Sequence, residues 1–415
     1  MEPSATRITQ PWLHAPGPRA VMAALGGKAR FVGGCVRDAL AGRPVHDIDL
    51  ATPLPPEAVM TALREAAIKA VPTGIDHGTV TAVYDHQPFE ITTLRRDVET
   101  DGRRATVAFT DDWVADAQRR DFTFNALYCD ADGTVYDPVG GLADLHAHRV
   151  RFIGAPLERI GEDALRILRF FRFHAWYGTG AIDTEGLAAC RARADDLAIL
   201  SGERVAMEMT RLLAAPAPLE TLEIMRQAGV LDRVLPEASQ FGRFGRLVRV
   251  ENRIGQPDAI RRLGALIDGD EPAARALCQR WRRSNKITTR LLGMARPHPP
   301  VHPRLDERAA RRLLYELGRE RFVDLTLLAW ADHLDGPDDD EAGWRALLAR
   351  AEHWTQPEFT LRGGDVMAHG IASGPKVGAI LKQLENWWID QDFAPGRAAT
   401  LAELDRLVAA ERKKE

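Results

Sequence analysis

Two short segments near the N-terminus carry residues that could bind a nucleoside triphosphate. Gly33 and Gly34 follow an apolar run, and Asp47 and Asp49 come later, one residue apart from each other. Glycines at a helix N-terminus let backbone N–H groups approach phosphates, where the helix dipole also favours negative charge. Two carboxylates at this spacing share one face of a strand, and Mg²⁺ suits such an all-oxygen site beside phosphates. Either motif alone is also typical of a tight turn or of a strand end that faces solvent.

A third acid, Glu90, stands in a run with strand-like alternation. The run Phe89–Leu94 and the preceding run Gly78–Tyr84 are separated by four residues, which indicates a hairpin. If the strand of Glu90 lies beside a strand at Asp47–Leu50, three carboxylates can converge. Such a site could hold one or two Mg²⁺ between a 3′-hydroxyl nucleophile and a triphosphate. The expected chemistry is therefore nucleotidyl transfer.

Asp163 and Arg166 could select the base of the nucleotide. They are three residues apart in a predicted helix over Leu157–Phe173 and would share a helix face. An acceptor beside a fork of donors can pair with cytosine or adenine, whereas uracil or guanine would leave a buried group unpaired. Arg169 and Arg172 continue this face, and arginines on a packed helix need anions such as triphosphate oxygens. A solvated helix with ion pairs three residues apart is the alternative.

The elements that position these residues divide the chain into an α/β part and a helical remainder. Residues 1–145 are predicted to form a mixed sheet with helices, and the chain beyond about residue 146 is predicted to be helical almost throughout. A polar stretch at 97–110 indicates a loop or ribbon. Further helices are predicted at Pro18–Leu25, Arg37–Leu40, Pro55–Ala67, Asp121–Leu127, Gly202–Leu213, Leu219–Ala228, Ala273–Trp281, Glu307–Leu317 and Val377–Leu384, and further strands at Ala29–Val32 and Thr134–Tyr136.

The composition excludes several classes of protein. A chain of 415 residues is too long for one core, so several domains are expected. The net charge of −4 argues against a uniformly basic nucleic-acid coat but leaves local patches open. Cys35, Cys129, Cys190 and Cys278 are far apart, which disfavours a zinc site or a disulfide framework and suits a reducing cytosol. Neither a signal peptide nor a membrane-spanning run is found, so we expect a cytoplasmic protein without a membrane partner.

These segments belong to an ordered set of motifs over residues 30–213 that resembles a known family. The chain is similar to the bacterial tRNA nucleotidyltransferase and poly(A) polymerase family, class II of the polymerase-beta-like nucleotidyltransferases. Each motif alone is modest evidence, but the ordered set is highly specific. The motifs are Gly33-Gly34-x-Val36-Arg37-Asp38, Asp47-x-Asp49, Phe89-Glu90-Ile91-Thr92-Thr93-Leu94-Arg95, Arg119-Arg120-Asp121-Phe122-Thr123-Phe124-Asn125-Ala126, Asp137-Pro138-Val139-Gly140-Gly141, Glu162-Asp163-Ala164-Leu165-Arg166 and Glu203-Arg204-x-x-x-Glu208.

The resemblance implies an α+β fold with four parts. A polymerase-beta-like nucleotidyltransferase head with a small mixed sheet and helices would occupy residues 1–145, and an all-helical neck with the nucleotide-selecting helix would occupy 146–215. A helical, basic, RNA-binding body (216–335) and a helical, tRNA-binding tail (336–415) would follow.

The resemblance also implies roles for single residues. Asp47 and Asp49 match the metal ligands of the family, and Glu90 matches its third acidic position. Within the nucleotide site, Gly34 and Arg37 match positions that hold the triphosphate. Arg120, Asp121 and Asn125 fall in a motif that handles the ribose and phosphates, and Asp163 with Arg166 match the pair that reads the base. The implied nucleotide-binding residues are Gly33, Gly34, Arg37 and Asp38; Arg120, Asp121 and Asn125; and Asp163, Arg166, Arg169 and Arg172.

The C-terminal half has a strongly basic segment. Residues 275–321 contain thirteen Arg/Lys and four Asp/Glu, an excess that suits a phosphate backbone. Arginines paired with acids on helix surfaces are the alternative. Near the C-terminus, a Gly-Pro-Lys sequence at a helix start is similar to the family's tail segment, which holds the tRNA elbow. The predicted RNA-binding residues are Arg280, Arg282, Arg283, Lys286 and Lys376.

Taken together, the motifs and the family that they resemble imply a Mg²⁺-dependent, template-independent nucleotidyltransferase. It would add C, C and A to the 3′ end of tRNA, with tRNA, CTP and ATP as partners and no DNA. A poly(A) polymerase, an enzyme that adds only CC or only A, and a non-catalytic RNA-binding protein on the same scaffold are the alternatives. The intact Asp47, Asp49 and Glu90 argue against the last of these.

Overall fold

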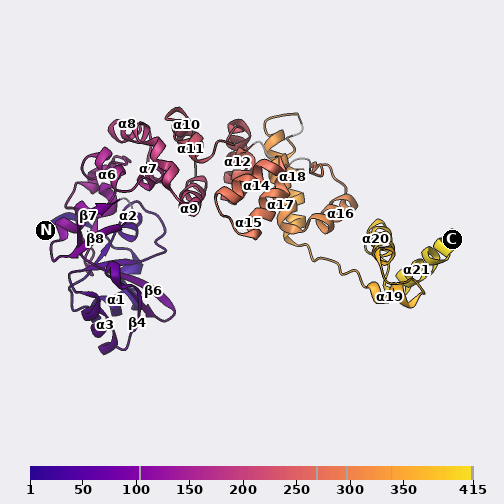
Figure 1. Ribbon diagram of the computed structural model, residues 1–415, viewed down its shortest axis with the longest axis horizontal. Coiled ribbons are helices and arrows are strands. Elements are labelled where there is room, and N and C mark those ends of the chain that lie inside the picture. The colour runs from indigo at the N-terminus through magenta and orange to yellow at the C-terminus, as the bar shows by residue number, and fades with distance from the viewer. Residues whose placement is uncertain (102–103, 268–269, 296–297, 338, 413–415) are drawn as a thin grey trace. The chain divides into compact units, whose positions relative to one another are not determined.

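The chain folds into two compact units, an α/β unit and a helical one (Figure 1). The computed structural model describes all residues except 102–103, 268–269, 296–297, 338 and 413–415. Unit 1 comprises Met1–Ala238 with Leu277–Arg283, and unit 2 comprises Ser239–Ala276 with Ser284–Glu415. The predicted α+β class is confirmed by the sheet in unit 1 and the helices that follow it. The division into four parts stays a prediction.

A mixed sheet forms the centre of unit 1. Its central strands pair in the order β9-β2-β3-β6-β5, so the segments that carry the predicted site residues are neighbours. Among the described residues the sheet has eight strands, which in spatial order are β1 (Pro3–Arg7), β10 (Thr134–Tyr136), β9 (Tyr128–Cys129), β2 (Arg30–Val32), β3 (Asp49–Thr52), β6 (Gln87–Thr93), β5 (Thr79–Tyr84) and β4 (Lys69–Gly74).

The pairing of β3 with β6 confirms the predicted neighbourhood of the acids. The two strands run parallel, with Asp49 opposite Glu90, and β5 and β6 form the predicted antiparallel hairpin. The predicted strand at Asp47–Leu50 is wrong at its start, because β3 begins at Asp49 and Asp47 precedes it. Asp47 therefore belongs to the exposed chain that enters the strand.

The polar stretch after β6 forms a separate ribbon. Strands β7 (Arg95–Asp101) and β8 (Arg104–Phe109) pair antiparallel, so the loop or ribbon predicted at 97–110 is a ribbon. The two residues between the strands lie outside the described part of the chain. The ribbon leads directly into helix α4, whose first turn is capped by Asp112 through a bond from the backbone N–H of Val114 (2.8 Å).

Helices and short 3₁₀ turns cover the sheet and continue the chain of unit 1. The predicted helix at Pro18–Leu25 corresponds to α1 and that at Pro55–Ala67 to α3. The helices described within this unit are α1 (Pro16–Ala24), α2 (Gly34–Leu40), α3 (Pro56–Glu65), α4 (Trp113–Gln118), α5 (Gly141–His146), α6 (Pro156–Glu162), α7 (Leu165–Tyr177), α8 (Thr184–Ala192), α9 (Gly202–Leu213), α10 (Leu219–Gln227) and α11 (Leu231–Val234), with 3₁₀ turns η1 (Pro11–His14), η2 (Ile75–His77), η3 (Thr123–Ala126) and η4 (Ala194–Ile199).

Two predicted helices are wrong in extent. The helix predicted at Asp121–Leu127 is only the 3₁₀ turn η3, because its backbone pairs elsewhere: the N–H of Ile153 donates to the Asp121 carbonyl, and that of Thr123 to the Arg151 carbonyl. The helix predicted at Leu157–Phe173 is broken into α6 and α7. Asp163 between them has an extended backbone (φ −153°, ψ 107°).

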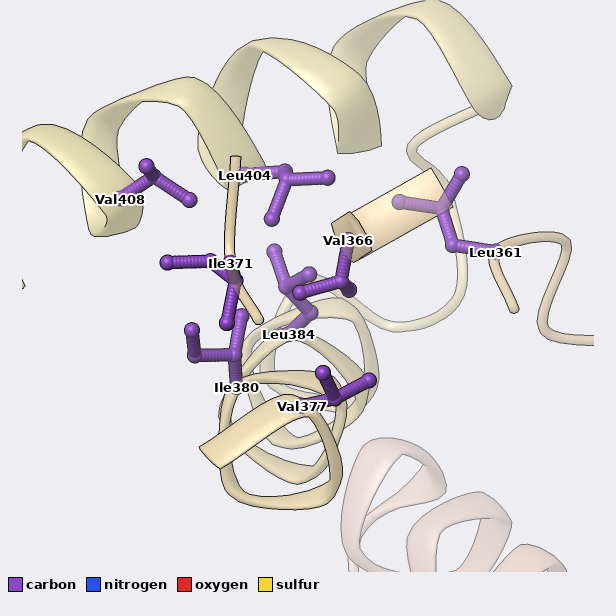
Figure 2. Packing of buried hydrophobic residues seen from close by; sticks show 8 residues of the cluster. All are labelled: Leu361, Val366, Ile371, Val377, Ile380, Leu384, Leu404 and Val408. Carbon is purple, nitrogen blue, oxygen red and sulfur yellow. The ribbon is translucent and has the colours of Figure 1, made fainter. Parts of the chain in front are cut away.

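Unit 2 is helical and has a separate apolar core near its end. In Figure 2, Leu404 and Val408 of α21 face side chains of α20, and Val366 of α19 joins the same cluster. None of the described helices of the chain is long and apolar enough to cross a membrane. The described helices are α12 (Phe241–Ile254), α13 (Ala259–Leu266), α15 (Asn285–Met294), α16 (Glu307–Leu317), α17 (Arg319–His333), α18 (Glu341–Glu352), α19 (Gly363–Ala368), α20 (Pro375–Asp390) and α21 (Arg397–Arg412), and α14 (Glu271–Arg280) belongs partly to each unit.

Candidate nucleotide-binding site

A polar cleft of about 490 Å³ in unit 1 gathers most of the predicted site residues. Asp47, Asp38 and Arg172 are not among its lining residues. Four polar residues line it to which the sequence had given no role: Thr92, Arg95, Arg119 and Arg204. The predicted residues that line it are Gly33, Gly34, Arg37, Asp49, Glu90, Arg120, Asp121, Asn125, Asp163, Arg166 and Arg169.

The acidic part of the cleft is electrostatically strained. Burial, and then the negative charges of Glu90 and Asp47, raise the pKa of Asp49 to about 6, and Arg120 only partly offsets them. Asp49 and Glu90 are directly paired on adjacent strands. Neighbouring carboxylates whose charges raise the pKa of Asp49 are a donor set whose repulsion a divalent cation would relieve. The described residues hold no group of three or more His, Cys, Asp or Glu side chains already arranged as a ligand shell.

The glycine turn and Arg37 form one wall of the cleft. Gly33 has φ +70°, a conformation that L side chains rarely adopt, and it immediately precedes α2. Arg37 is buried, and its Nη1 donates to Oδ1 of Asn125 at 2.6 Å. The neighbouring Asp38 points its carboxylate to Nε of Arg37 (3.0 Å) and the hydroxyl of Tyr177 (2.5 Å). Asp38 thus supports Arg37 instead of lining the cleft.

A chain of carboxylates and arginines continues from Asn125 to α9. The Asn125 amide donates to Oδ1 of Asp121 (3.0 Å), and Nε of Arg169 donates to Oδ2 of the same aspartate (2.7 Å). Glu208 on α9, which is fully buried, accepts from Nε of Arg172 (2.5 Å). The anions predicted to accompany the arginines of α7 are therefore protein carboxylates in this structure.

Replacing Asp121 with alanine is expected to lower the free energy of unfolding at pH 7 by about 2 kcal/mol, because the half-buried Arg169 would lose its closest carboxylate and keep only Glu208 at 3.7 Å. Burial opposes the charge of Asp121, but Arg169, Asn125 and the N–H of Phe122 outweigh it and lower its pKa to about 2. Because the folded pKa is below the unfolded value, this stabilisation is present above pH 4 and is lost as the pH falls toward 2. Urea unfolding across this pH range measures it.

Asp132 provides the control for that experiment. It pairs with Arg7 at 2.8 Å, but both side chains are more than half exposed. Asp132→Ala should therefore cost less than about 1 kcal/mol. Equal losses for the two variants would contradict the role given to Asp121.

Asp116 on α4 organises the two arginines at the mouth of the cleft. Its buried carboxylate accepts bonds from Arg119 (2.6 Å), Arg120 (2.9 Å) and the hydroxyl of Tyr128 (2.8 Å). Burial disfavours its charge, but Arg120 and Arg119 prevail and lower the pKa of Asp116 to about 2. The N–H of Arg95, the first residue of β7, approaches the same carboxylate at 3.4 Å. The sequence motifs contained no signal for Asp116, because its partners are known only from the fold.

Asp163 and Arg166 both line the cleft, but they do not lie on one continuous helix as predicted. Asp163 ends α6, and its Oδ1 accepts the backbone N–H of Leu165 at 3.0 Å. Its Oδ2 accepts from Arg204 of α9 at 2.7 Å. Arg166, in the first turn of α7, donates to the carboxylate of Glu162 and to the carbonyl of Arg159 (2.7 Å). The break in the helix, and not a shared helix face, places this acceptor beside this donor.

Comparison with known proteins identifies the family. Residues 29–151 match the poly A polymerase head domain, and residues 181–241 match the probable RNA and SrmB-binding site of polymerase A. The mitochondrial CCA tRNA nucleotidyltransferase 1 of Danio rerio is 32% identical over 91% of this chain and 87% of its own length. The chain belongs to the CCA tRNA nucleotidyltransferase family. It is thus a nucleotidyltransferase by family, as the motifs predicted.

Bacterial members of the CCA tRNA nucleotidyltransferase family give the same result. The CCA-adding enzyme of Limosilactobacillus fermentum is 33% identical over 89% of this chain and 90% of its own. The crystal structure of the Bacillus stearothermophilus CCA-adding enzyme in complex with CTP superposes with a TM-score of 0.79 at 27% identity. The match covers 97% of this chain and 100% of that one.

The predicted RNA-binding residues of this family member lie outside the cleft. Arg280 forms two bonds with Glu237 (2.7 and 2.8 Å), and Arg282 pairs with Glu203 at 3.1 Å, so both arginines have carboxylate partners. Lys286 is exposed in the first turn of α15, and Lys376 lies in the first turn of α20. Arg283 is half-buried at the turn before α15.

Proposed function

We propose that the chain adds C, C and A to the 3′ end of tRNA, using CTP and ATP and releasing pyrophosphate. The RNA 3′-hydroxyl attacks the α-phosphate of the bound nucleotide. The observation that carries this proposal is a single cleft that joins paired carboxylates (Asp49 and Glu90) to a base-reading acceptor and donor (Asp163 and Arg166). The family membership and the relatives named CCA-adding enzyme support it.

Mg²⁺ is the cofactor that the acidic part of the cleft would take. Asp47 and Asp49 would hold it, with Glu90 as the third carboxylate, and the raised pKa of Asp49 is the feature that favours a cation there. A bound Mg²⁺ would lower the pKa of the attacking hydroxyl and neutralise charge on the triphosphate.

The remaining residues position the nucleotide. Arg37 and Arg120, both braced by carboxylates or amides, would bind triphosphate oxygens beside the Gly33 turn. Asn125 and Asp121 connect Arg37 with Arg169 through their hydrogen bonds, and the ribose would lie beside them. Cytosine and adenine both present a donor next to an acceptor, which Asp163 and Arg166 can match with the opposite order.

A primer-extension assay tests the proposed activity. The substrates are tRNAs that end before the first C, before the second C and before A, together with an unrelated RNA, each with one NTP at a time. We expect CTP use on the first two tRNAs, ATP use on the third, and little addition to the unrelated RNA. Long A-tracts on the unrelated RNA without CTP use would instead indicate a poly(A) polymerase, and activity on only some tRNAs a partial enzyme.

We also propose a tRNA-binding surface on unit 2. A cavity of about 640 Å³ lies where α15 and α17 begin, and Lys286, Arg319 and Arg321 line it. The side chains of Lys286 and Arg319 form no ion pair or hydrogen bond with the described part of the chain. Asn285 and Thr289 add polar groups to the same lining. Such a basic concavity suits phosphate oxygens of an RNA backbone.

The double substitution Lys286→Ala with Arg319→Ala is expected to weaken tRNA binding about tenfold and to reduce the slope of log K against log salt by about 1 to 2, because two phosphate contacts are lost. Filter binding at several salt concentrations measures both quantities. The double substitution Arg64→Ala with Lys69→Ala, at exposed sites on α3 and β4, is the control of equal charge change. An unchanged slope in the double variant would remove this cavity from the binding surface.

We place this activity in the cytoplasm. The four cysteines of the chain are buried as free thiols, which suits a reducing compartment.

A further inference from the structure

Arg159 connects the segment of Arg119 and Arg120 with Glu162 and Arg166. Neither the motifs nor the family comparison assigns it a role. It lies on α6, three residues before Glu162, and its side chain is only 11% exposed. It does not line the cleft itself. A buried arginine costs free energy unless its donors are used, so the partners of its guanidinium show what it holds together.

One side of the guanidinium binds the segment that carries the triphosphate arginines. Nη2 of Arg159 donates to the backbone carbonyls of Arg119 and Arg120, the latter at 2.8 Å. These carbonyls follow α4, so they have no partner within that helix. Arg159 therefore fixes the backbone just before Asp121, whose carboxylate holds Asn125 and Arg169.

The other side of Arg159 binds the base-reading group. Its Nη1 donates to Glu162 at 2.7 Å, and its backbone carbonyl accepts from Nη1 of Arg166 at 2.7 Å. The same nitrogen of Arg166 also donates to Glu162. Arg159, Glu162 and Arg166 thus form a closed set in which the direction of the Arg166 guanidinium is fixed by two acceptors.

We propose that Arg159 is a positioning residue for nucleotide selection. It sets the place of Arg166 relative to the Arg120–Asp121 segment, and therefore the place of the base edge relative to the triphosphate. This inference rests on the proposed nucleotide addition. A planar guanidinium is required, because one side chain must donate to two carbonyls on one side and to a carboxylate on the other. A lysine has a single ammonium group and cannot reach both sides at once.

The test compares Arg159→Gln and Arg159→Lys with the unchanged protein in single-nucleotide addition to tRNA. We expect the KM for CTP to rise about tenfold and the preference for CTP over UTP to fall about tenfold. The value of kcat with CTP should change less than threefold, since Asp49 and Glu90 keep their register. Arg159→Lys should retain more selectivity than Arg159→Gln, because it keeps one charged donor.

A matched control separates positioning from stability. Arg149 forms an ion pair with the buried carboxylate of Asp144 at 2.5 Å, and it lines no part of the cleft. Arg149→Gln should lower the melting temperature without changing the preference for CTP over UTP. If Arg159→Gln and Arg159→Lys lower the melting temperature but keep wild-type KM and selectivity, Arg159 is only structural and the inference is wrong. Failure of the unchanged protein to use CTP or ATP would overturn the proposed function instead.

Discussion

Replacing Asp49 with asparagine is expected to reduce nucleotide addition by at least about 10³-fold while leaving tRNA affinity within twofold. The substitution keeps the shape of the side chain but removes one of two negative charges paired across β3 and β6. Metal-assisted stabilisation of a transferred phosphoryl group contributes several kcal/mol, and each 1.4 kcal/mol is tenfold in rate. Single-turnover addition of CTP and filter binding of tRNA measure the two quantities.

The control for this substitution is Glu57→Gln, which removes an exposed carboxylate from the first turn of α3. It should change neither quantity more than twofold. A parallel loss of activity and tRNA binding in Asp49→Asn would contradict the metal-binding role and point to a structural one.

The pKa of Asp49 predicts a second property of the same variant. Its value of about 6 in the folded chain exceeds the ordinary 3.8, so the folded chain binds more protons between these limits. The stabilisation from this protonation is full below pH 3.8 and is lost as the pH rises through 6. Asp49→Asn should therefore raise the melting temperature of the metal-free protein at pH 8, and the gain should shrink toward pH 5. Adding Mg²⁺ should stabilise the unchanged protein but not the variant.

The face of β6 that Glu90 occupies could be predicted from the sequence because it depends on local alternation. Apolar residues on both sides of Glu90 fix which face of β6 it shares, and the hairpin of β5 with β6 fixes its neighbour. The parallel partner of β6 could only be supposed. The start of β3 at Asp49 depends on backbone pairing to β2, in which Arg30 lies opposite Ala51 and Phe31 opposite Leu50. Asp47 is therefore left outside the strand.

The break between α6 and α7 could not be predicted from the sequence. Apolar spacing continues through residues 157–173, so periodicity alone favours one helix. The break is stabilised by Asp163, which accepts from Leu165 locally and from Arg204 across 41 positions of the chain. The counter-ions of the arginines on α7 are equally remote: Glu208 lies 36 positions after Arg172. Long-range carboxylates of this kind leave no periodic signal.

Replacing Asp163 with asparagine is expected to lower the preference for CTP over UTP, and for ATP over GTP, by about 10²-fold. The carboxylate has lone pairs beyond those used by Leu165 and Arg204, and these can accept the exocyclic amino group of cytosine or adenine. The oxygen of asparagine can still accept the N–H of Leu165, so the start of α7 is retained, but asparagine has one acceptor oxygen instead of two. Nucleotides with the opposite order of donor and acceptor would then lose much of their penalty.

Two further variants decide whether this effect belongs to the acceptor. Arg204→Gln removes the ion pair of Asp163 at 2.7 Å but leaves the carboxylate, so it should lower selectivity much less than Asp163→Asn. Arg166→Gln removes the neighbouring donor, whose side chain is only 14% exposed, and should lose about as much selectivity as Asp163→Asn. Combining Asp163→Asn with Arg166→Gln should lower selectivity little further, because the base is no longer recognised once either partner is lost. Additive losses would instead mean that the two side chains act on the nucleotide separately.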